Sequence, residues 1–312
     1  MDPSTGLMLA GTESSQLPFL EIAGLMVALA AYVLSLVMWT AHVVLAKLVA
    51  RASTWTFYAA WTFTLVGELA LVTALVARGM QPAVPRLPLT TLFEITALVQ
   101  LGAAGSLLVI MPRAKDLRAA APVVMAVVVG LWAYGYSKHQ PITSDLVPAL
   151  KSVWLQIHVA TAVLSYGPLF MSGVTSIMAV IMFWSGGRFT EERPSEEEGG
   201  EPQPSIADRY EEWTYRIIAF GFPWLTALII TGAIWANYAW GRAWGWDVKE
   251  MWSAITWLIY VAYLHMRLRA GWRGLPASLV ASAALLAMVV TYVGITWVVR
   301  VAGVQSLHDY GG

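Results

Sequence analysis

The chain has 312 residues, of which 58% are hydrophobic and only 12% are charged, so it carries too few polar residues to cover a soluble globule of this size. Its formal net charge is zero and no basic patch stands out, which argues against a nucleic-acid partner because phosphate contacts need clustered Lys and Arg. Cysteine is absent, which excludes disulfides, thiolate zinc sites, iron–sulfur clusters and thiol nucleophiles, so any metal must be held by His, Met, Asp or Glu.

Eight apolar runs are long enough to cross a bilayer, since a membrane-spanning helix needs roughly 20 mainly apolar residues. They lie at 20–46, 54–77, 90–111, 119–136, 152–184, 213–236, 250–268 and 276–300. The sequence therefore predicts an all-α, polytopic transmembrane helix bundle of about eight spans. The first run has no basic stretch before it and no persuasive cleavage site, so it is expected to be a retained span.

Basic residues are concentrated in alternate connections between these runs. Twelve of the nineteen lysines and arginines lie there, namely Lys47, Arg51, Arg113, Lys115, Arg118, Arg188, Arg193, Arg209, Arg216, Arg267, Arg269 and Arg273. Lys and Arg are retained on the cytoplasmic side of membrane proteins. This asymmetry predicts that both termini and the 237–249 loop lie outside.

The connection at 185–212 differs from the others in composition. It is rich in Pro, Gly and Glu and has no hydrophobic periodicity, which is typical of a mobile linker, and the predicted orientation puts it in the cytoplasm. The linker divides the chain into an N-terminal five-span part, 1–184, and a C-terminal three-span part, 213–312.

The external loop of the C-terminal part, residues 237–252, is rich in tryptophan. Its aromatic and charged residues include Trp240, Trp244, Trp246, Asp247, Lys249, Glu250 and Trp252. Tryptophan at a membrane interface usually forms an aromatic belt, but a belt does not require four tryptophans within thirteen residues, interleaved with Gly and Ala. Small residues between the rings leave a broad apolar shelf, which predicts a binding surface for a planar macrocycle.

The run from Trp240 to His265, WGRAWGWDVKEMWSAITWLIYVAYLH, resembles the WWD signature of the haem-handling proteins of cytochrome c biogenesis, CcsA (ResC), CcmC and CcmF. The number of spans, the position of the signature near the C-terminus and the ending SLHDYGG are most similar to the System II CcsA (ResC) family. Further similar stretches are PLTTLFE at 88–94 and LQIHV at 155–159. The resemblance covers roughly residues 86–312 and is weak in the first two spans.

This resemblance implies a haem-handling and haem-exporting subunit of a cytochrome c synthase, in a bacterial plasma membrane or a thylakoid-type membrane. Such a subunit presents haem b on the outer face for covalent attachment to the Cys-x-x-Cys-His motif of apocytochrome c. The resemblance also implies a CcsB (ResB)-type membrane partner and a thiol-reducing pathway, because this chain has no thiol. No general acid, nucleophile or metal cluster is evident in the sequence, so any catalysis would consist of positioning the reactants.

Two histidines are predicted to bind iron beside the tryptophan loop. His158 lies about six residues into the fifth span, roughly 9 Å below its outer end, and His308 follows the eighth span on the same side. Two neutral imidazoles on opposite faces of the macrocycle would give six-coordinate iron. The resemblance implies the same two residues as axial ligands.

The other three histidines receive different predictions. His265 lies about fifteen residues beyond Glu250, roughly 22 Å deeper, and the resemblance assigns its Tyr-Leu-His position to a second haem site in the bilayer. His42 lies at a similar depth and is one candidate to complete that inner site, although a partner's histidine could serve instead. His139 is expected to be an ordinary loop residue.

Several charged residues keep two interpretations. Asp247 stands where the loop becomes a helix, so it is expected either to cap that helix or to contribute to the haem surface. Lys249 or Arg242 could pair with a haem propionate. Glu68 lies mid-span and Glu94 at the start of the third span, and each could serve helix packing or a haem or proton role.

Two other classes of protein fit eight spans. One is a proton-coupled secondary transporter of a small solute without bound haem, which would use the two intramembrane glutamates. The other is a bis-His electron-transfer cytochrome. Neither class needs the tryptophan loop, so haem handling is the preferred interpretation.

Overall fold

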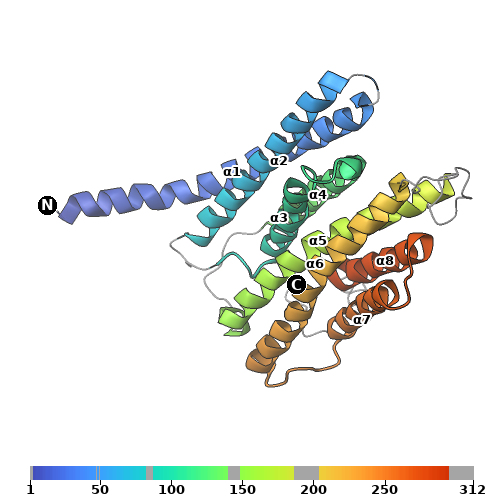
Figure 1. Ribbon diagram of the computed structural model, residues 1–312. Coiled ribbons are helices and arrows are strands. Elements are labelled where there is room, and N and C mark those ends of the chain that lie inside the picture. The colour runs from blue at the N-terminus through green and yellow to red at the C-terminus, as the bar shows by residue number, and fades with distance from the viewer. Residues whose placement is uncertain are drawn as a thin grey trace, which may run out of the picture. The chain divides into compact units, whose positions relative to one another are not determined.

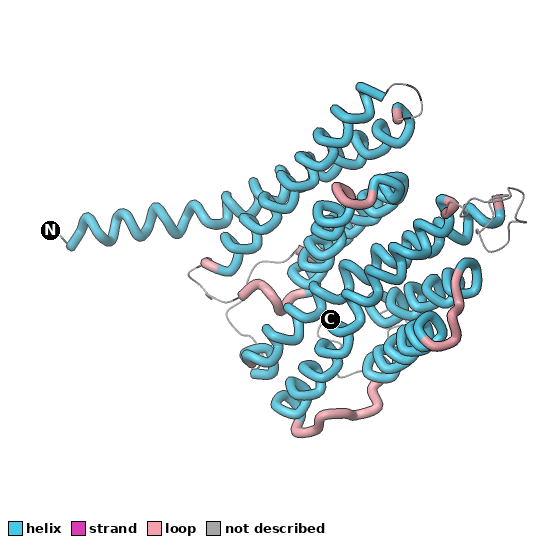
Figure 2. Tube along the Cα trace, viewed as in Figure 1, coloured by secondary structure: helices cyan, strands magenta, loops and turns pink. Residues whose placement is uncertain are grey.

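The fold is helical throughout the described chain. The computed structural model describes residues 3–46, 48, 50–81, 87–139, 148–185 and 204–294, and this part contains eight α-helices and no strand (Figures 1 and 2). The all-α prediction is therefore confirmed. The helices are α1 (Pro3–Leu45), α2 (Ala50–Gly79), α3 (Leu92–Ile110), α4 (Ala121–Ser137), α5 (Val153–Trp184), α6 (Ile206–Trp240), α7 (Val248–Leu268) and α8 (Gly274–Val289).

Within the described residues, seven helices are long and apolar enough to cross a membrane, which confirms the prediction of a polytopic bundle. The remaining helix, α7, corresponds to the predicted span 250–268 and is not among these seven. Its 21 residues include Lys249, Glu250, His265 and Arg267, which lower its hydropathy. The sides of the membrane on which the loops lie stay a prediction.

The chain forms two compact units. Unit 1 comprises Met1–Arg113 and Ala121–Gln156, and unit 2 comprises Ala114–Ala120 and Ile157–Gly312. Helices α1–α4 thus belong to unit 1, whereas α6–α8 and nearly all of α5 belong to unit 2. The predicted division at the 185–212 linker stays a prediction, because most of that linker lies outside the described residues.

In unit 1, α1 and α2 pack closely because each helix has a glycine where the other helix approaches. A Cβ atom at Gly67 would lie 2.5 Å from the buried ring of Tyr32, and one at Gly24 would lie 2.9 Å from the carbonyl oxygen of Ala70. Small residues of this kind let membrane helices approach each other. The side chains between the two helices are therefore held at fixed positions.

In unit 2, hydroxyl pairs and small residues join the helices. Four hydroxyl–hydroxyl hydrogen bonds link different helical segments of its described residues, at 2.7 Å, 3.0 Å, 3.1 Å and 3.3 Å: Thr175–Thr214, Ser176–Ser282, Thr256–Thr291 and Thr161–Thr231. The buried core combines leucines with alanines of α8 and two buried tyrosines of α7. Interhelical hydrogen bonds and small residues replace the hydrophobic driving force that is lacking between helices in lipid.

One end of unit 2 gathers four helix termini. The first turns of α5 meet the second half of α6 where His158 contacts the carbonyl of Leu228. Thr256, in the first half of α7, contacts Thr291, just past the end of α8. Residues 241–247 join α6 to α7 at this same end. We call it the tryptophan-loop end of unit 2.

Candidate functional site

The loop between α6 and α7 has a defined backbone. Helix α6 ends at Gly241, whose φ of 72° is the left-handed conformation that glycine adopts most easily. Trp246 has a φ of 59° and is the one non-glycine residue with positive φ in the described chain. Such conformations are uncommon for bulky residues and occur frequently at ligand-binding positions. The backbone thus holds the Trp246 ring outward, with 74% of the residue exposed.

Asp247 caps helix α7. Its Oδ1 accepts a hydrogen bond from the backbone N–H of Lys249 at 2.9 Å, while Oε2 of Glu250 accepts from the N–H groups of Asp247 at 3.1 Å and Gly245 at 2.7 Å. This capping box satisfies donors that the first helical turn leaves without intrahelical partners. Asp247 was expected either to cap α7 or to contribute to the haem surface, and these hydrogen bonds are those of a cap.

The cap leads to a testable expectation. Asp247→Ala should lower the free energy of unfolding by about 1 kcal/mol, whereas Asp247→Asn, which can still cap, should stay close to the parent protein. Thermal or detergent unfolding followed by tryptophan fluorescence measures the difference. A haem content that falls equally in both variants, with stability unchanged, would instead assign the carboxylate to the ligand.

His158 is held by helix α6. Its Nδ1 lies 3.0 Å from the carbonyl oxygen of Leu228, and because a carbonyl only accepts, the ring proton is on Nδ1 and the lone pair is on Nε2. A Cβ atom at Gly232 would lie 2.8 Å from Cε1 of His158, so the absence of a side chain there lets the ring lie against the helix. A histidine that ligates a metal is commonly oriented in this way by a backbone carbonyl.

Aromatic rings connect His158 to the loop. The half-buried imidazole is stacked on the buried ring of Trp235, with ring centroids 6.2 Å apart and an interplanar angle of 14°. Trp235 in turn makes an edge contact with Trp240 at 4.8 Å. Trp244 and Trp246 form a second, perpendicular pair at 6.0 Å. We call His158 with these four tryptophans the tryptophan surface.

The structure brings together only some of the predicted site residues. His158, Trp240, Trp244 and Trp246 lie at the tryptophan-loop end, and Trp252 is half-buried in the second turn of α7. His308 lies outside the described residues. Leu228, Gly232 and Trp235 also belong to the site and were not predicted from the sequence. Their signal in the sequence is a glycine and a tryptophan shortly before the loop, on the same helix.

The two inner histidines lie in different units. His265 is in the last turn of α7, at the end of that helix opposite the tryptophan loop, and it is exposed. His42 belongs to unit 1 and is 3% exposed, with Nδ1 3.2 Å from Oγ1 of Thr56. Their pairing at an inner haem site stays a prediction.

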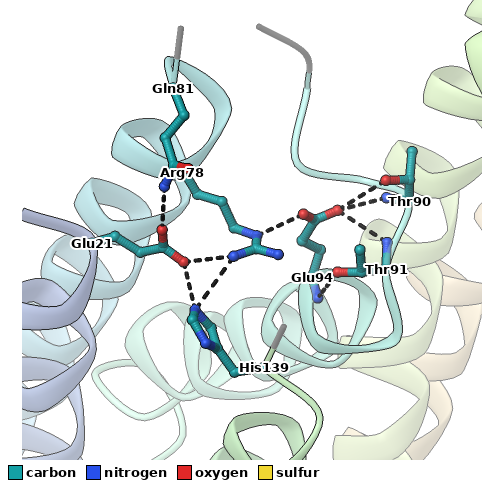
Figure 3. A network of polar contacts seen from close by, with 7 residues as sticks. All are labelled: Glu21, Arg78, Gln81, Thr90, Thr91, Glu94 and His139. Atoms are coloured by element: carbon teal, nitrogen blue, oxygen red, sulfur yellow. Dashed lines mark hydrogen bonds and ion pairs between the residues drawn. The ribbon is translucent and has the colours of Figure 1, made fainter. Parts of the chain in front are cut away.

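A second polar cluster lies within unit 1 (Figure 3). Arg78 donates from Nε to Glu94 and from Nη1 to Glu21, both at 2.7 Å, and the three side chains are at most 4% exposed. Nε2 of His139 lies 2.7 Å from the same Glu21 carboxylate, and Gln81 donates to its other oxygen at 2.6 Å. We call Glu21, Arg78, Gln81, Glu94 and His139 the ion cluster.

The ion cluster settles the local role of Glu94 and changes the interpretation of His139. Glu94 also accepts hydrogen bonds from the backbone of Thr90 and Thr91, so it both caps α3 and pairs with Arg78. The histidine predicted to be an ordinary loop residue joins a buried ion pair. An arginine at the end of an apolar run was a signal for such a pair, but its partners are at least 16 residues away in sequence.

Comparison with known proteins finds relatives in cytochrome c biogenesis, the class of protein that the tryptophan loop resembles. The chain is 37% identical over 180 residues to the cytochrome c biogenesis protein CcsA of Chlamydomonas reinhardtii, covering 57% of this chain and 46% of that protein. It is 34% identical over 209 residues to CcsA of Gloeobacter violaceus, covering 53% of this chain and 60% of that protein. The chain thus matches only about half of the length of these relatives.

The fold is also found in a solved structure. The cytochrome c haem lyase CcmF aligns with 89% of this chain and 50% of its own, with a TM-score of 0.57 and 18% identity, a likeness that shows the fold alone. The family model described as cytochrome c assembly protein matches residues 22–302, which include both units. The chain therefore belongs to the cytochrome c assembly protein family.

Proposed function

We propose that this chain binds haem as cargo on the tryptophan surface and presents it for covalent attachment to apocytochrome c. The observation that carries the proposal is the fixed tautomer of His158, whose Nδ1–H is bound to the Leu228 carbonyl. The ring nitrogen able to bind iron is then Nε2, in a half-buried imidazole stacked on Trp235. This arrangement would give a cytochrome c assembly protein a ligand for iron and an aromatic surface for the macrocycle.

Each residue of the proposed site would contact the part of haem that its chemistry suits. His158, with His308 as the proposed second ligand, would hold the iron, while Trp240, Trp244 and Trp246 would contact the porphyrin face. Lys249 and Arg242 offer cations for the propionates. His265, on the exposed face of α7, is proposed to bind haem at an inner site before it reaches the outer one.

The attachment itself would be an addition in which the chain positions the reactants. The S–H of each cysteine of an apocytochrome Cys-x-x-Cys-His motif adds across a haem vinyl group. The S–H bond and the C=C π bond break, an S–C bond forms, and the proton is transferred to the neighbouring vinyl carbon. The proposal includes haem b as the cargo, a CcsB (ResB)-type partner and an external thiol-reducing pathway.

Absorption spectra of the detergent-purified protein, oxidised and reduced, test this function. The parent protein from haem-replete cells should show the sharp bands of six-coordinate haem, and a His158→Ala/His308→Ala double variant should lose or shift them. His265→Ala should lower the amount of haem that reaches the outer site without changing the band positions. A colourless parent protein would contradict haem handling and favour a transporter.

A further inference from the structure

Glu68 is a carboxyl group near the middle of a membrane-spanning helix. In the span Thr54–Gly79 it lies roughly 21 Å from one end and roughly 16 Å from the other, at 1.5 Å per residue. Tyr32 donates its hydroxyl to Oε1 of Glu68 at 2.8 Å, and no cation pairs with this carboxyl among the described residues. An ionisable group at this depth with one neutral donor is a candidate functional group.

The second oxygen of Glu68 faces helix α3 at a place without a side chain. A Cβ atom at Gly105 would lie 3.7 Å from Oε2. Among the described residues, the titratable group that contacts the carboxyl is Tyr32 of α1, and the residue of α3 next to Oε2 is Gly105. Oε2 thus lies at van der Waals distance from the Cβ position of Gly105 and has no hydrogen-bond partner among the described residues.

Two buried polar groups lack partners between α3 and α4. Gln100 is 2% exposed and its Oε1 has no hydrogen-bond partner, and Trp132 is 7% exposed and its Nε1 has none. A Cβ atom at Gly135, one turn from Trp132, would lie 3.9 Å from Nε2 of Gln100. An unpaired acceptor and an unpaired donor on facing helices are what a buried water satisfies.

These groups lie in order along α3. Gln100 is six residues, roughly 9 Å, beyond Glu94 of the ion cluster, and Gly105 is five residues, roughly 7.5 Å, farther. Measured along the axis of α3, the unpaired groups thus lie between the ion cluster and Glu68, with Gln100 toward Gly135 of α4 and Gly105 toward Glu68 of α2. His139, whose side chain is 22% exposed, supplies the accessible edge of that cluster.

On the opposite side of Glu68, the buried polar groups have hydrogen-bond partners. Toward His42, the hydroxyls of Ser35 and Thr64 hydrogen-bond each other at 2.7 Å, and Nε1 of Trp39 donates to Thr64 at 3.3 Å. These groups satisfy one another without water. Among the described residues of unit 1, the buried polar groups without partners therefore lie on the ion-cluster side of Glu68.

We propose that Glu68 is a proton-binding site that exchanges protons with the ion-cluster end of unit 1 through water held by Gln100 and Trp132. A hydronium ion arriving by this route protonates the carboxylate and leaves one water molecule, and the reverse step returns the proton to the same end. The site gives unit 1 a protonatable group in the bilayer that is accessible from one face. It does not depend on haem binding in unit 2.

Infrared difference spectroscopy of the full chain in lipid, with pH steps, detects this carboxyl by its C=O stretching band. The band should appear on acidification, shift in D2O and be lost in Glu68→Gln. Gln100→Leu should retain the band but slow its exchange with D2O several-fold. Thr73→Val is the matched control, because this exposed hydroxyl on the same helix bonds only the carbonyl of Leu69, and it should change neither.

Two outcomes would overturn the inference. If the parent and Glu68→Gln give the same pH-difference spectrum, Glu68 only joins α1 to α2 through Tyr32. If Gln100→Leu exchanges as fast as the parent, the route through α3 and α4 is wrong. Tyr32→Phe provides a second identification of the band, since loss of the hydroxyl donor must change its frequency. Haem spectra of the same samples report the proposed function separately.

Discussion

Replacing His158 by alanine is expected to remove most haem from the tryptophan surface, lowering haem affinity by more than about tenfold. The imidazole is the only group of the described tryptophan surface that can bind iron, and its orientation depends on the Leu228 carbonyl and on the space at Gly232. Loss of the ring removes the iron ligand and leaves only aromatic contacts. Absorption spectra and haem content of the purified variant measure the loss.

Imidazole in the buffer distinguishes a lost ligand from a damaged fold. A His158→Ala protein that keeps its fold leaves a space the size of the missing ring, so added imidazole should restore six-coordinate bands. His139→Ala is the matched control, because it removes a histidine of unit 1 and should leave the haem spectrum unchanged. Gly232→Ala keeps the imidazole but crowds Cε1, so it should weaken haem binding less than removal of the ring. Full haem content in His158→Ala would refute the assignment.

The second large effect is expected on stability. Arg78→Met should lower the free energy of unfolding by about 3–5 kcal/mol, because it leaves Glu21 and Glu94 buried without their shared cation. Arg216→Met is the matched control: its 2.9 Å pair with Glu212 is exposed, so the same change should cost less than about 1 kcal/mol. Detergent-induced unfolding followed by tryptophan fluorescence compares the two variants.

A compensating variant tests the cause of that loss. Adding Glu21→Gln and Glu94→Gln to Arg78→Met removes the uncompensated charges and should recover part of the stability. A triple variant as unstable as Arg78→Met would mean that packing of the arginine stem, rather than charge, holds α1, α2 and α3 together at this point. Equal effects of Arg78→Met and Arg216→Met would show that the ion cluster contributes little to stability.

The sequence predicted those features that depend on residues close together in the chain. Apolar runs of sufficient length predicted the helices, because the backbone hydrogen bonds of a helix are local and lipid demands that they be satisfied. The tryptophans interleaved with Gly and Ala predicted the loop at the end of α6, and its Asp-x-Lys-Glu stretch suggested the cap that the structure contains. The family resemblance proposed from this loop is confirmed by a match over residues 22–302.

The tertiary structure decided what depends on contacts between distant segments. His158 receives its tautomer from Leu228, 70 residues away, and His139 meets Glu21 across 118 residues. No local pattern encodes such pairs, because the register and rotation of packed helices determine which side chains meet. The apolar runs made the chain a membrane protein and the tryptophan loop carried its family resemblance. The packing of the helices oriented the imidazole of His158 and left Glu68 without a cation among the described residues.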